Sequence, residues 1–362
     1  AIKRAVGSRI PVAVVGRICN RKTAENIIAS GKADLVAMGR ALLADPFLPA
    51  KLAEGRDDEI LTCIGCNEGC TGMLNECRPI SCALNPRTGY EDDYPMTQAD
   101  APKAVVVIGG GPAGCEAALT AAQRGHKVVL FEATSTLGGL ANIAALPPGK
   151  GVFATLGTYF STMLPRAGVD VRLNTKADAD AVRALHPDHV IVATGGTPIV
   201  PRFCADSPVV LAQDILTGAA QAGSRVLVIG GGLVGSETAE FLADKGREVT
   251  VVELRDGIAL DMEYKTRQML MPKLAALGVV CLTETEVLEI GCNGNVKVKT
   301  PYLEKELSGF DTVVVALGYR PDAALCADLA AADIDFVQVG DCKKVGKIIN
   351  GVWEAFQLAY RI

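Results

Sequence analysis

Four cysteines within a short stretch of the chain have the spacing of an inorganic cofactor site. Cys63, Cys66, Cys70 and Cys82 follow the pattern C-x2-C-x3-C-x11-C. Four cysteine thiolates are the ligand set of a cubane iron–sulfur cluster. A structural zinc site more often pairs two close doublets. We therefore favour a [4Fe-4S] cluster, with zinc as the next interpretation and four inert thiols as the last.

The residues around this pattern support a wrapped loop in a reduced protein. Cys77 lies inside the long spacing and is interpreted as a non-ligand, while Gly65, Gly69 and Gly72 let the backbone bend around a bulky core. The 12 cysteines are spread over 362 residues, unlike the dense cysteines of a small secreted disulfide scaffold. A cytoplasmic location is therefore expected.

A glycine-rich motif further along predicts a dinucleotide site. Gly109, Gly111 and Gly114 form G-x-G-x-x-G directly after an apolar strand predicted at 104–108, and Glu132 ends the next strand, 23 residues after Gly109. The glycines give a tight turn, a close approach to the pyrophosphate and close packing of helix on strand. The carboxylate would bind ribose hydroxyls.

The same unit recurs, which indicates two dinucleotides. Gly230, Gly232 and Gly235 follow a strand at 225–229, and Glu253 again stands 23 residues after the first glycine. A carboxylate about 4 Å from a 2′-phosphate repels it by roughly 1–4 kcal/mol per unit charge, depending on solvent exposure. Glu253 therefore favours NADH over NADPH, although Arg255 could offset the penalty.

Two strands near the start of the chain end in the same dipeptide. Buried strands are predicted at 11–15 and 33–38, ending in Gly16–Arg17 and Gly39–Arg40, with a helix at 23–30 capped by Thr23. The loops after the last strands of a parallel barrel commonly hold a phosphate, which glycine N–H groups and arginine can bind. The alternative is that both arginines are simply solvated.

The remaining polar candidates are weaker. A strand at 337–340 ends in Gly340–Asp341, where the aspartate binds a sugar-like chain or serves as a turn or N-cap residue, and a helix is predicted at 351–361. We interpret His126, His186 and His189 as structural.

Bulk composition argues against several partner classes. The net charge of −5 gives no reason to expect nucleic acid or an anionic membrane. No apolar run reaches the ~18 residues of a membrane span. The chain opens on Ala1, in what reads as the end of a helix, and two parallel strands cannot close a barrel. We therefore expect a longer protein of which this is the C-terminal part.

Together these motifs resemble the multidomain NADH:flavin oxidoreductases of the old yellow enzyme superfamily, which include 2,4-dienoyl-CoA reductase and 2-enoate reductase. The resemblance implies FMN in the barrel, with its phosphate near Gly16, Arg17, Gly39 and Arg40, and a [4Fe-4S] cluster on the four cysteines. It implies FAD on the first glycine motif and Glu132, with Asp341 at the ribityl chain, and NADH or NADPH on the second motif and Glu253.

The expected fold is α/β: the end of a (β/α)8 barrel, a four-cysteine segment, and two Rossmann-like domains. The predicted boundaries are 1–60 for the barrel part, 61–101 for the iron–sulfur segment and linker, 102–200 and 312–362 for the FAD-binding domain, and 201–311 for an inserted NAD(P)H-binding domain.

The implied reaction passes electrons from NAD(P)H through FAD and the cluster to FMN, which reduces an activated C=C bond of an enoate or enoyl-CoA type. The alternatives are an amine-type dehydrogenase of the same family and a non-catalytic electron-transfer fragment. The family's proton donors lie in the barrel part that this chain lacks, so no catalytic residue is assigned. A small unsaturated substrate and a possible homo-oligomer are the expected partners.

Overall fold

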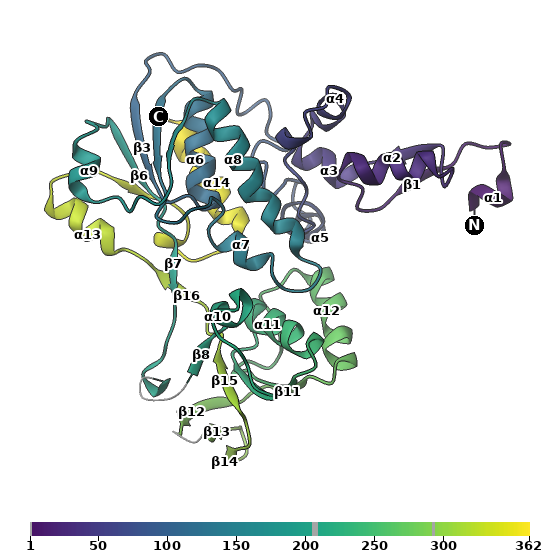
Figure 1. The fold of residues 1–362 in the computed structure, drawn as a ribbon, viewed down its shortest axis with the longest axis vertical. Coiled ribbons are helices and arrows are strands. Elements are labelled where there is room, and N and C mark those ends of the chain that lie inside the picture. The colour runs from purple at the N-terminus through teal and green to yellow at the C-terminus, as the bar shows by residue number, and fades with distance from the viewer. Residues whose placement is uncertain (1, 205–208, 292–293) are drawn as a thin grey trace. The chain divides into compact units, whose positions relative to one another are not determined.

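The computed structural model describes residues 2–204, 209–291 and 294–362. These residues form two compact units, each built on its own five-stranded parallel sheet (Figure 1). The first unit extends to Ala141 and adds Val152–Gly195 and Ala323–Ile362, whereas the second comprises Asn142–Gly151 and Gly196–Asp322. The longer segment of the second unit thus begins a few residues before the predicted insertion of 201–311 and ends some ten residues after it, and the short segment Asn142–Gly151 lies outside that prediction.

The sheet of the first unit has the strand order β17-β6-β3-β4-β5. Its strands are β3 (Ala104–Ile108), β4 (Lys127–Phe131), β5 (Asp170–Arg172), β6 (His189–Val192) and β17 (Val337–Gln338). The central strand is apolar throughout because both of its faces are buried. The predicted strands at 104–108 and 127–131 are confirmed to the residue.

Helices cover this sheet and connect its strands. They are α6 (Pro112–Gln123), α8 (Thr155–Arg166), α9 (Ala179–Arg183), α13 (Ala324–Ala331) and α14 (Ile348–Tyr360). The helix α7 (Leu140–Ala144) and a 3-10 turn at Gly151–Ala154 each span a boundary between the units along the chain, and a second 3-10 turn lies at Gly340–Cys342. The last helix begins three residues before the predicted 351. Small residues of α6 and α14, including Ala118 and Ala355, pack in one buried core, so these two helix backbones lie close together.

The sheet of the second unit has the order β11-β10-β9-β15-β8. Its strands are β8 (Val209–Leu211), β9 (Arg225–Ile229), β10 (Glu248–Val252), β11 (Val280–Leu282) and β15 (Thr312–Val315). The helices are α10 (Ala212–Thr217), α11 (Leu233–Asp244) and α12 (Tyr264–Ala276). An antiparallel sheet of β12 (Glu286–Ile290), β13 (Val296–Lys299) and β14 (Glu304–Leu307) follows, and β7 (Gly196–Pro198) pairs antiparallel with β16 (Tyr319–Pro321).

The start of the chain departs from its prediction in two ways. The strands β1 (Ala13–Val15) and β2 (Leu35–Ala37) pair in parallel, but they are not buried: Val15 is 72% exposed and Leu35 58%. No described layer of this chain covers them, so the expectation of buried strands is wrong here. The helix α2 (Arg21–Ala29) is capped by Asn20, whose side chain accepts from the Thr23 N–H, so Thr23 is not the cap.

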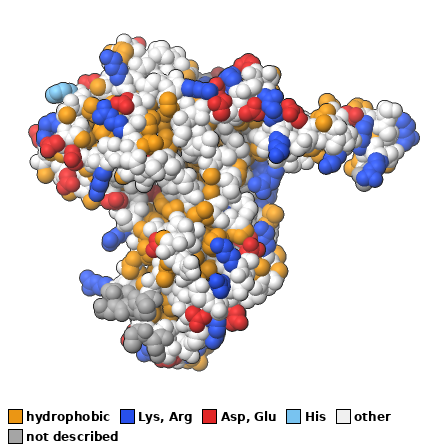
Figure 2. Space-filling view, in the orientation of Figure 1, with side chains coloured by type: hydrophobic (Ala, Val, Ile, Leu, Met, Phe, Trp, Pro, Cys, Tyr) orange, Lys and Arg blue, Asp and Glu red, His pale blue; other side chains and the backbone are white. Residues whose placement is uncertain are grey.

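Short helices link this part to the cysteine segment. They are α3 (Gly39–Ala44), α4 (Leu48–Ala53) and a 3-10 turn at Asp57–Glu59, whereas α1 (Ile2–Val6) precedes β1. Across the face shown in Figure 2, acidic and basic side chains are interspersed. Among the described residues, no helix combines the length and the apolar character that crossing a bilayer requires.

Candidate cofactor-binding sites

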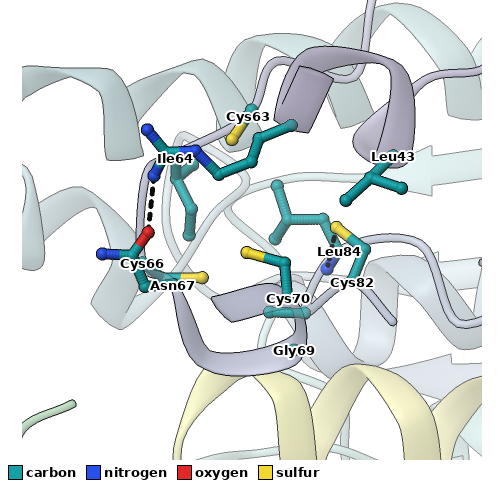
Figure 3. A pocket seen from close by; sticks show the side chains of 11 residues that line it. Leu43, Cys63, Ile64, Cys66, Asn67, Gly69, Cys70, Cys82 and Leu84 are labelled. Atoms are coloured by element: carbon teal, nitrogen blue, oxygen red, sulfur yellow. Dashed lines mark hydrogen bonds between the residues drawn. The ribbon is translucent and has the colours of Figure 1, made fainter. Parts of the chain in front are cut away.

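The four predicted cysteine ligands line one hollow in the first unit (Figure 3). The wall of the hollow also includes Leu43, Ile64, Leu84 and the cation Arg40. The apolar residues restrict water, whereas the guanidinium offers a positive charge. A cluster held by four thiolates is anionic, so one adjacent cation suits it.

Local backbone conformation brings the fourth cysteine to the first three. Asn67 adopts a left-handed conformation (φ 64°) and starts a π-helix, Glu68–Gly72, which leads into α5 (Met73–Asn75). A Cβ on Gly69 would lie 2.8 Å from the backbone carbon of Cys82. The Ser81 N–H also donates to the Gly69 carbonyl at 2.7 Å. Glycine at 69 therefore lets the returning chain place Cys82 against the turn that carries Cys70.

The thiols of this hollow differ in their surroundings. Burial raises the pKa of Cys66 to about 12 and also raises the pKa of Cys82. A hydrogen bond with Cys19 lowers the pKa of Cys63 to about 6, with further lowering from Arg40 and Arg17. Buried thiols become thiolates when a metal cation holds them. The positive charges of Arg17 and Arg40 therefore favour the thiolate of Cys63.

The donor set of the hollow is made of thiols alone. In the part of the chain that the structure describes, no three His, Cys, Asp or Glu side chains stand close enough together to hold a single metal ion. A cubane cluster places its four cysteine ligands on four separate iron atoms. Four thiols spread around one hollow therefore have the donor chemistry that an iron–sulfur cluster takes.

Both Gly-Arg dipeptides lie beside the cysteine segment. Arg17 has a positive φ of 49°, and its Nη2 lies 3.4 Å from where a Cβ of Gly65 would stand. Arg40 Nη1 donates to Asn67 Oδ1. Gly16 and Gly39, at the ends of β1 and β2, face open space. The structure thus brings these residues together at one end of the two parallel strands, and their binding of a phosphate stays a prediction.

The first glycine motif has the close contacts that its pattern predicts. A Cβ on Gly109 would lie 2.2 Å from the Ala193 carbonyl oxygen, and one on Gly114 would lie 1.9 Å from the Gly109 carbonyl oxygen. Gly111, at the start of α6, faces open space. Glu132 is buried and accepts from the Gly110 N–H at 2.7 Å. This carboxylate therefore fixes the glycine loop, and its contact with a ribose stays a prediction.

The second motif repeats this framework. A Cβ on Gly230 would lie 2.5 Å from the Ala316 carbonyl oxygen, and one on Gly235 would lie 1.8 Å from the Gly230 carbonyl oxygen. Glu253 accepts from the Gly231 N–H at 2.6 Å.

The second motif differs from the first at the amino end of α11, where an acidic side chain binds a helix N–H. The Asp261 carboxylate accepts from the Leu233 N–H at 2.9 Å and would lie 3.3 Å from a Cβ on Gly232. Sequence reasoning missed this acid because it lies 28 positions after Leu233.

Each motif also carries a glutamate two residues after its third glycine, half-buried Glu116 in the first motif and buried Glu237 in the second. Burial raises the pKa of Glu116 to about 7. Burial likewise raises the pKa of Glu237, and an ion pair with Lys150 opposes that effect. The repeat therefore also includes a glutamate on each helix, and Glu237 of the second motif forms an ion pair with Lys150.

The structure gives Asp341 a turn contact. Asp341 Oδ1 accepts from the Gly346 N–H at 3.0 Å, and burial raises the pKa of this aspartate. Gly340, with φ 68°, would place a Cβ 3.0 Å from Ala113, beside the first glycine motif. Asp341 is thus a turn residue at the edge of that motif, and its contact with a ribityl chain stays a prediction.

Two further residues contact the cysteine segment: Trp353 of α14 and Lys347, the N-cap residue of that helix. Trp353 Nε1 donates to the Cys82 carbonyl at 2.9 Å. Lys347 Nζ pairs with Glu68 Oε1 at 2.8 Å. Neither was predicted, and the available signal was that Trp353 is the one tryptophan of the chain. Of the histidines, His126 Nδ1 accepts from the Lys103 N–H, in keeping with its structural interpretation.

Comparison with known families assigns both parts of the chain. Residues 103–341 match the pyridine nucleotide-disulphide oxidoreductase family. Residues 2–59 match the NADH:flavin oxidoreductase / NADH oxidase family. The first match contains both glycine motifs and the second contains both Gly-Arg dipeptides, in the order that the resemblance predicted.

Individual relatives cover the whole chain. It is 43% identical over 371 residues to an NADH oxidase of Thermoanaerobacter brockii, matching 100% of this chain and 56% of the relative. It is 33% identical over 363 residues to a cinnamate reductase of Clostridium sporogenes, matching 98% and 53%. The chain thus spans about half the length of the curated relatives it matches.

A solved structure agrees with these matches. A 2-naphthoyl-CoA reductase, solved with 2-naphthoyl-CoA, superposes with a TM-score of 0.94 at 32% identity and covers 99% of this chain and 55% of that one. The fold is therefore the mixed α/β fold of FAD- and NAD-binding oxidoreductases. By its family matches, this chain belongs to the pyridine nucleotide-disulphide oxidoreductases and, with its NADH:flavin oxidoreductase segment, to the multidomain NADH:flavin oxidoreductases.

Proposed function

We propose that the protein containing this chain is an NADH-dependent flavin and iron–sulfur oxidoreductase that reduces an activated C=C bond. The observation that carries the proposal is the combination of two glycine motifs with a hollow lined by four thiols. When bound, FAD would accept a hydride from NADH and release its protons to solvent, and the [4Fe-4S] cluster would carry the two electrons one at a time. FMN, protonated from solvent, would deliver them to the substrate as a hydride equivalent, and a further proton would come from the protein or solvent.

The chain's own residues would bind and orient these groups. The N–H groups around Gly111 and Gly232 would hold the pyrophosphates of FAD and NADH. Cys63, Cys66, Cys70 and Cys82 would hold the cluster, and apolar side chains such as Leu84 would keep water from it. No residue of this chain is assigned as a proton donor.

The residues at the carboxyl ends of β1 and β2 would hold the FMN phosphate. Gly16 and Gly39 face open space that backbone contacts to an anion require. Arg17 and Arg40 already contact the cysteine segment, so the same two cations would face the phosphate on one side and the cluster on the other. Such shared contacts would keep the last two carriers close together.

The substrate class follows from the reductases among the relatives. Their names give cinnamate and 2-naphthoyl-CoA as substrates of those proteins. The first is an unsaturated carboxylate and the second a conjugated CoA thioester, so we propose an enoate or enoyl-CoA substrate. An amine dehydrogenase needs no nicotinamide site, and the complete second motif favours a reductase over it.

Iron, acid-labile sulfide and flavin analysis of the anaerobically purified protein tests this proposal. We expect about four iron atoms per chain and an EPR signal after reduction. Cys82→Ser should lose most of the iron, whereas Cys77→Ser should keep it, because Cys77 is exposed and is absent from the lining of the hollow. Zinc without iron or sulfide, or equal iron loss in both variants, would contradict the proposal.

A further inference from the structure

We infer that Trp353 is a positioning residue that couples the helix of the first glycine motif to the cluster ligand Cys82. The inference rests on the proposed function for the presence of FAD and the cluster. It concerns which residues of this chain set the geometry between the two sites. The contacts that carry it all lie within the first unit.

One face of α14 is packed closely on the helix that begins at the first glycine motif. Ala355 and Ala359 are fully buried in the same core as Ala117, Ala118 and Ala121 of α6. At the amino end, a Cβ on Gly351 would lie only 3.3 Å from Ala113. Small residues on both sides bring the backbones close together and leave little freedom to slide. The position of α14 is therefore tied to the expected FAD site.

Trp353 projects from this helix to the cysteine segment. Its indole N–H donates to the Cys82 carbonyl at 2.9 Å. Tyr90 packs against the indole edge-on, with ring centroids 5.6 Å apart and an interplanar angle of 87°. A large ring that is held on one side by Tyr90 and bonded at its tip has few orientations. It therefore fixes the backbone at Cys82.

Two neighbouring residues fasten α14 to the rest of the same segment. Lys347, the N-cap residue, pairs with Glu68 in the turn that carries Cys70. Ile348 packs in an apolar cluster with Ile64 and Leu84, which line the hollow. The helix thus contacts the segment near three of its four cysteines. A cofactor site keeps its geometry only when such supporting contacts hold its ligands.

Substitution of Trp353 tests the inference, and the quantity measured is how well the protein retains its cluster. Trp353→Phe keeps a ring in place but removes the donor to Cys82. Outer contacts of metal ligands typically change metal affinity by 10–100-fold, and because this one acts through a backbone carbonyl we expect iron loss to a chelator about 3- to 10-fold faster. The EPR signal of the reduced cluster should also change. FAD content should stay at the wild-type level.

Tyr360→Phe is the matched control. Tyr360 lies on the same helix and its hydroxyl donates to the Pro95 carbonyl at 2.9 Å, outside the cysteine segment. This variant should lose iron at the wild-type rate and keep the wild-type EPR signal.

A second pair of variants covers the case in which Trp353→Phe fails to fold. Lys347→Gln removes the ion pair with Glu68, and Lys343→Gln removes the ion pair with Glu354 of the same helix. Only the first should speed iron loss. Wild-type iron loss and EPR in both Trp353→Phe and Lys347→Gln would overturn the inference while leaving the proposed function intact. A wild-type protein without iron and sulfide would instead overturn the proposed function.

Discussion

The two glycine motifs share one framework and differ in what stands at the amino end of the helix. In both, a buried glutamate accepts from a glycine N–H, Glu132 from Gly110 and Glu253 from Gly231. In both, a backbone N–H of the loop after the second strand donates to the carbonyl of that same glycine. Gly138 donates to Gly110 at 2.8 Å, and Ala259 donates to Gly231 at 2.7 Å. The repeat therefore preserves the loop that would surround a pyrophosphate.

The difference lies on the anion-binding side of that loop. In the first motif α6 starts with Gly111 and Pro112, and a Cβ on Gly111 would meet no side chain within 4 Å. The second has the Asp261 carboxylate on the Leu233 N–H, with Arg255 Nη2 3.9 Å away. A carboxylate at a helix amino end stabilises the helix when no other anion is bound. We therefore expect the first site to keep a resident cofactor and the second to exchange its nucleotide.

The largest effect is expected when the third glycine of each motif is replaced by alanine, one motif at a time. Gly114→Ala and Gly235→Ala would place a methyl group 1.9 Å and 1.8 Å from a carbonyl oxygen, so each loop must shift. Gly114→Ala should purify without FAD. Gly235→Ala should keep FAD but lose its reduction by NADH, measured as bleaching of flavin absorbance.

Gly151→Ala is the control for both glycine variants, because its Cβ would meet open space without a positive φ. It should behave as wild type. If Gly235→Ala lost FAD as well, or if Gly114→Ala kept it, the two motifs would not have the separate roles assigned to them.

The pH dependence of stability should separate Glu116 from Glu237. The pKa of Glu116 is raised from 4.5 to about 7, so the folded state holds its proton more tightly than the unfolded state. The free energy of unfolding should then fall as pH rises through this window, by about 2 kcal/mol. Glu116→Gln should remove that part of the slope, measured by denaturant unfolding of the flavin-free protein between pH 5 and 8.

Glu237→Gln is the comparison for that measurement. It removes the ion pair between Glu237 and Lys150, so it should destabilise the fold at pH 8, where Glu116→Gln stabilises it. An unchanged pH slope in Glu116→Gln would contradict the assignment of the raised pKa to this residue.

The preference for NADH over NADPH should change by a smaller factor than the effects above when Glu253 loses its charge. Glu253→Gln removes the charge that would face a 2′-phosphate and should raise the ratio of NADPH to NADH affinity about 5-fold, or about 1 kcal/mol. The matched control is Glu248→Gln at the exposed start of the same strand, with 81% of its side chain accessible. A loss of NADH affinity without any gain for NADPH would show that Glu253 mainly holds the Gly231 loop.

The smallest effect is expected at Asp261. Asp261→Asn keeps an acceptor for Leu233 but removes a charge that is 46% exposed, so ADP-ribose should bind about 2- to 3-fold more tightly at low salt. The gain should shrink as ionic strength rises. Asp256→Asn, an exposed acid of the same loop, should change little. Weaker binding by Asp261→Asn would mean that this carboxylate supports the bound nucleotide.

The parts of the fold that sequence predicted are those set by local pattern. The strands at 104–108, 127–131, 225–229 and 248–252 agree with the structure to the residue, because apolar runs bounded by glycine leave few choices. The contacts that sequence missed join distant positions. Trp353 and Cys82 are 271 residues apart, and Asp261 meets a helix that begins 28 residues earlier. No periodicity encodes such pairs.

The errors near the start of the chain have a similar cause. Val15 and Leu35 were expected inside because their strands are apolar, yet burial depends on a covering layer that these strands do not have among the described residues. Asn20 caps α2 in place of Thr23 because both residue types can cap a helix and the geometry decides. Arg17 and Arg40 contact the cysteine segment through a loop packing that their own neighbours do not reveal.

Anaerobic titration of the desalted protein with NADH tests the central claim most directly. If one motif keeps FAD and the other exchanges nicotinamide, the protein should retain one FAD per chain and no NAD after desalting. Stoichiometric NADH should then bleach the flavin, and ADP-ribose should inhibit this competitively. Two retained FAD molecules per chain, or a flavin that NADH leaves oxidised, would contradict the division of roles between Gly109–Glu132 and Gly230–Glu253.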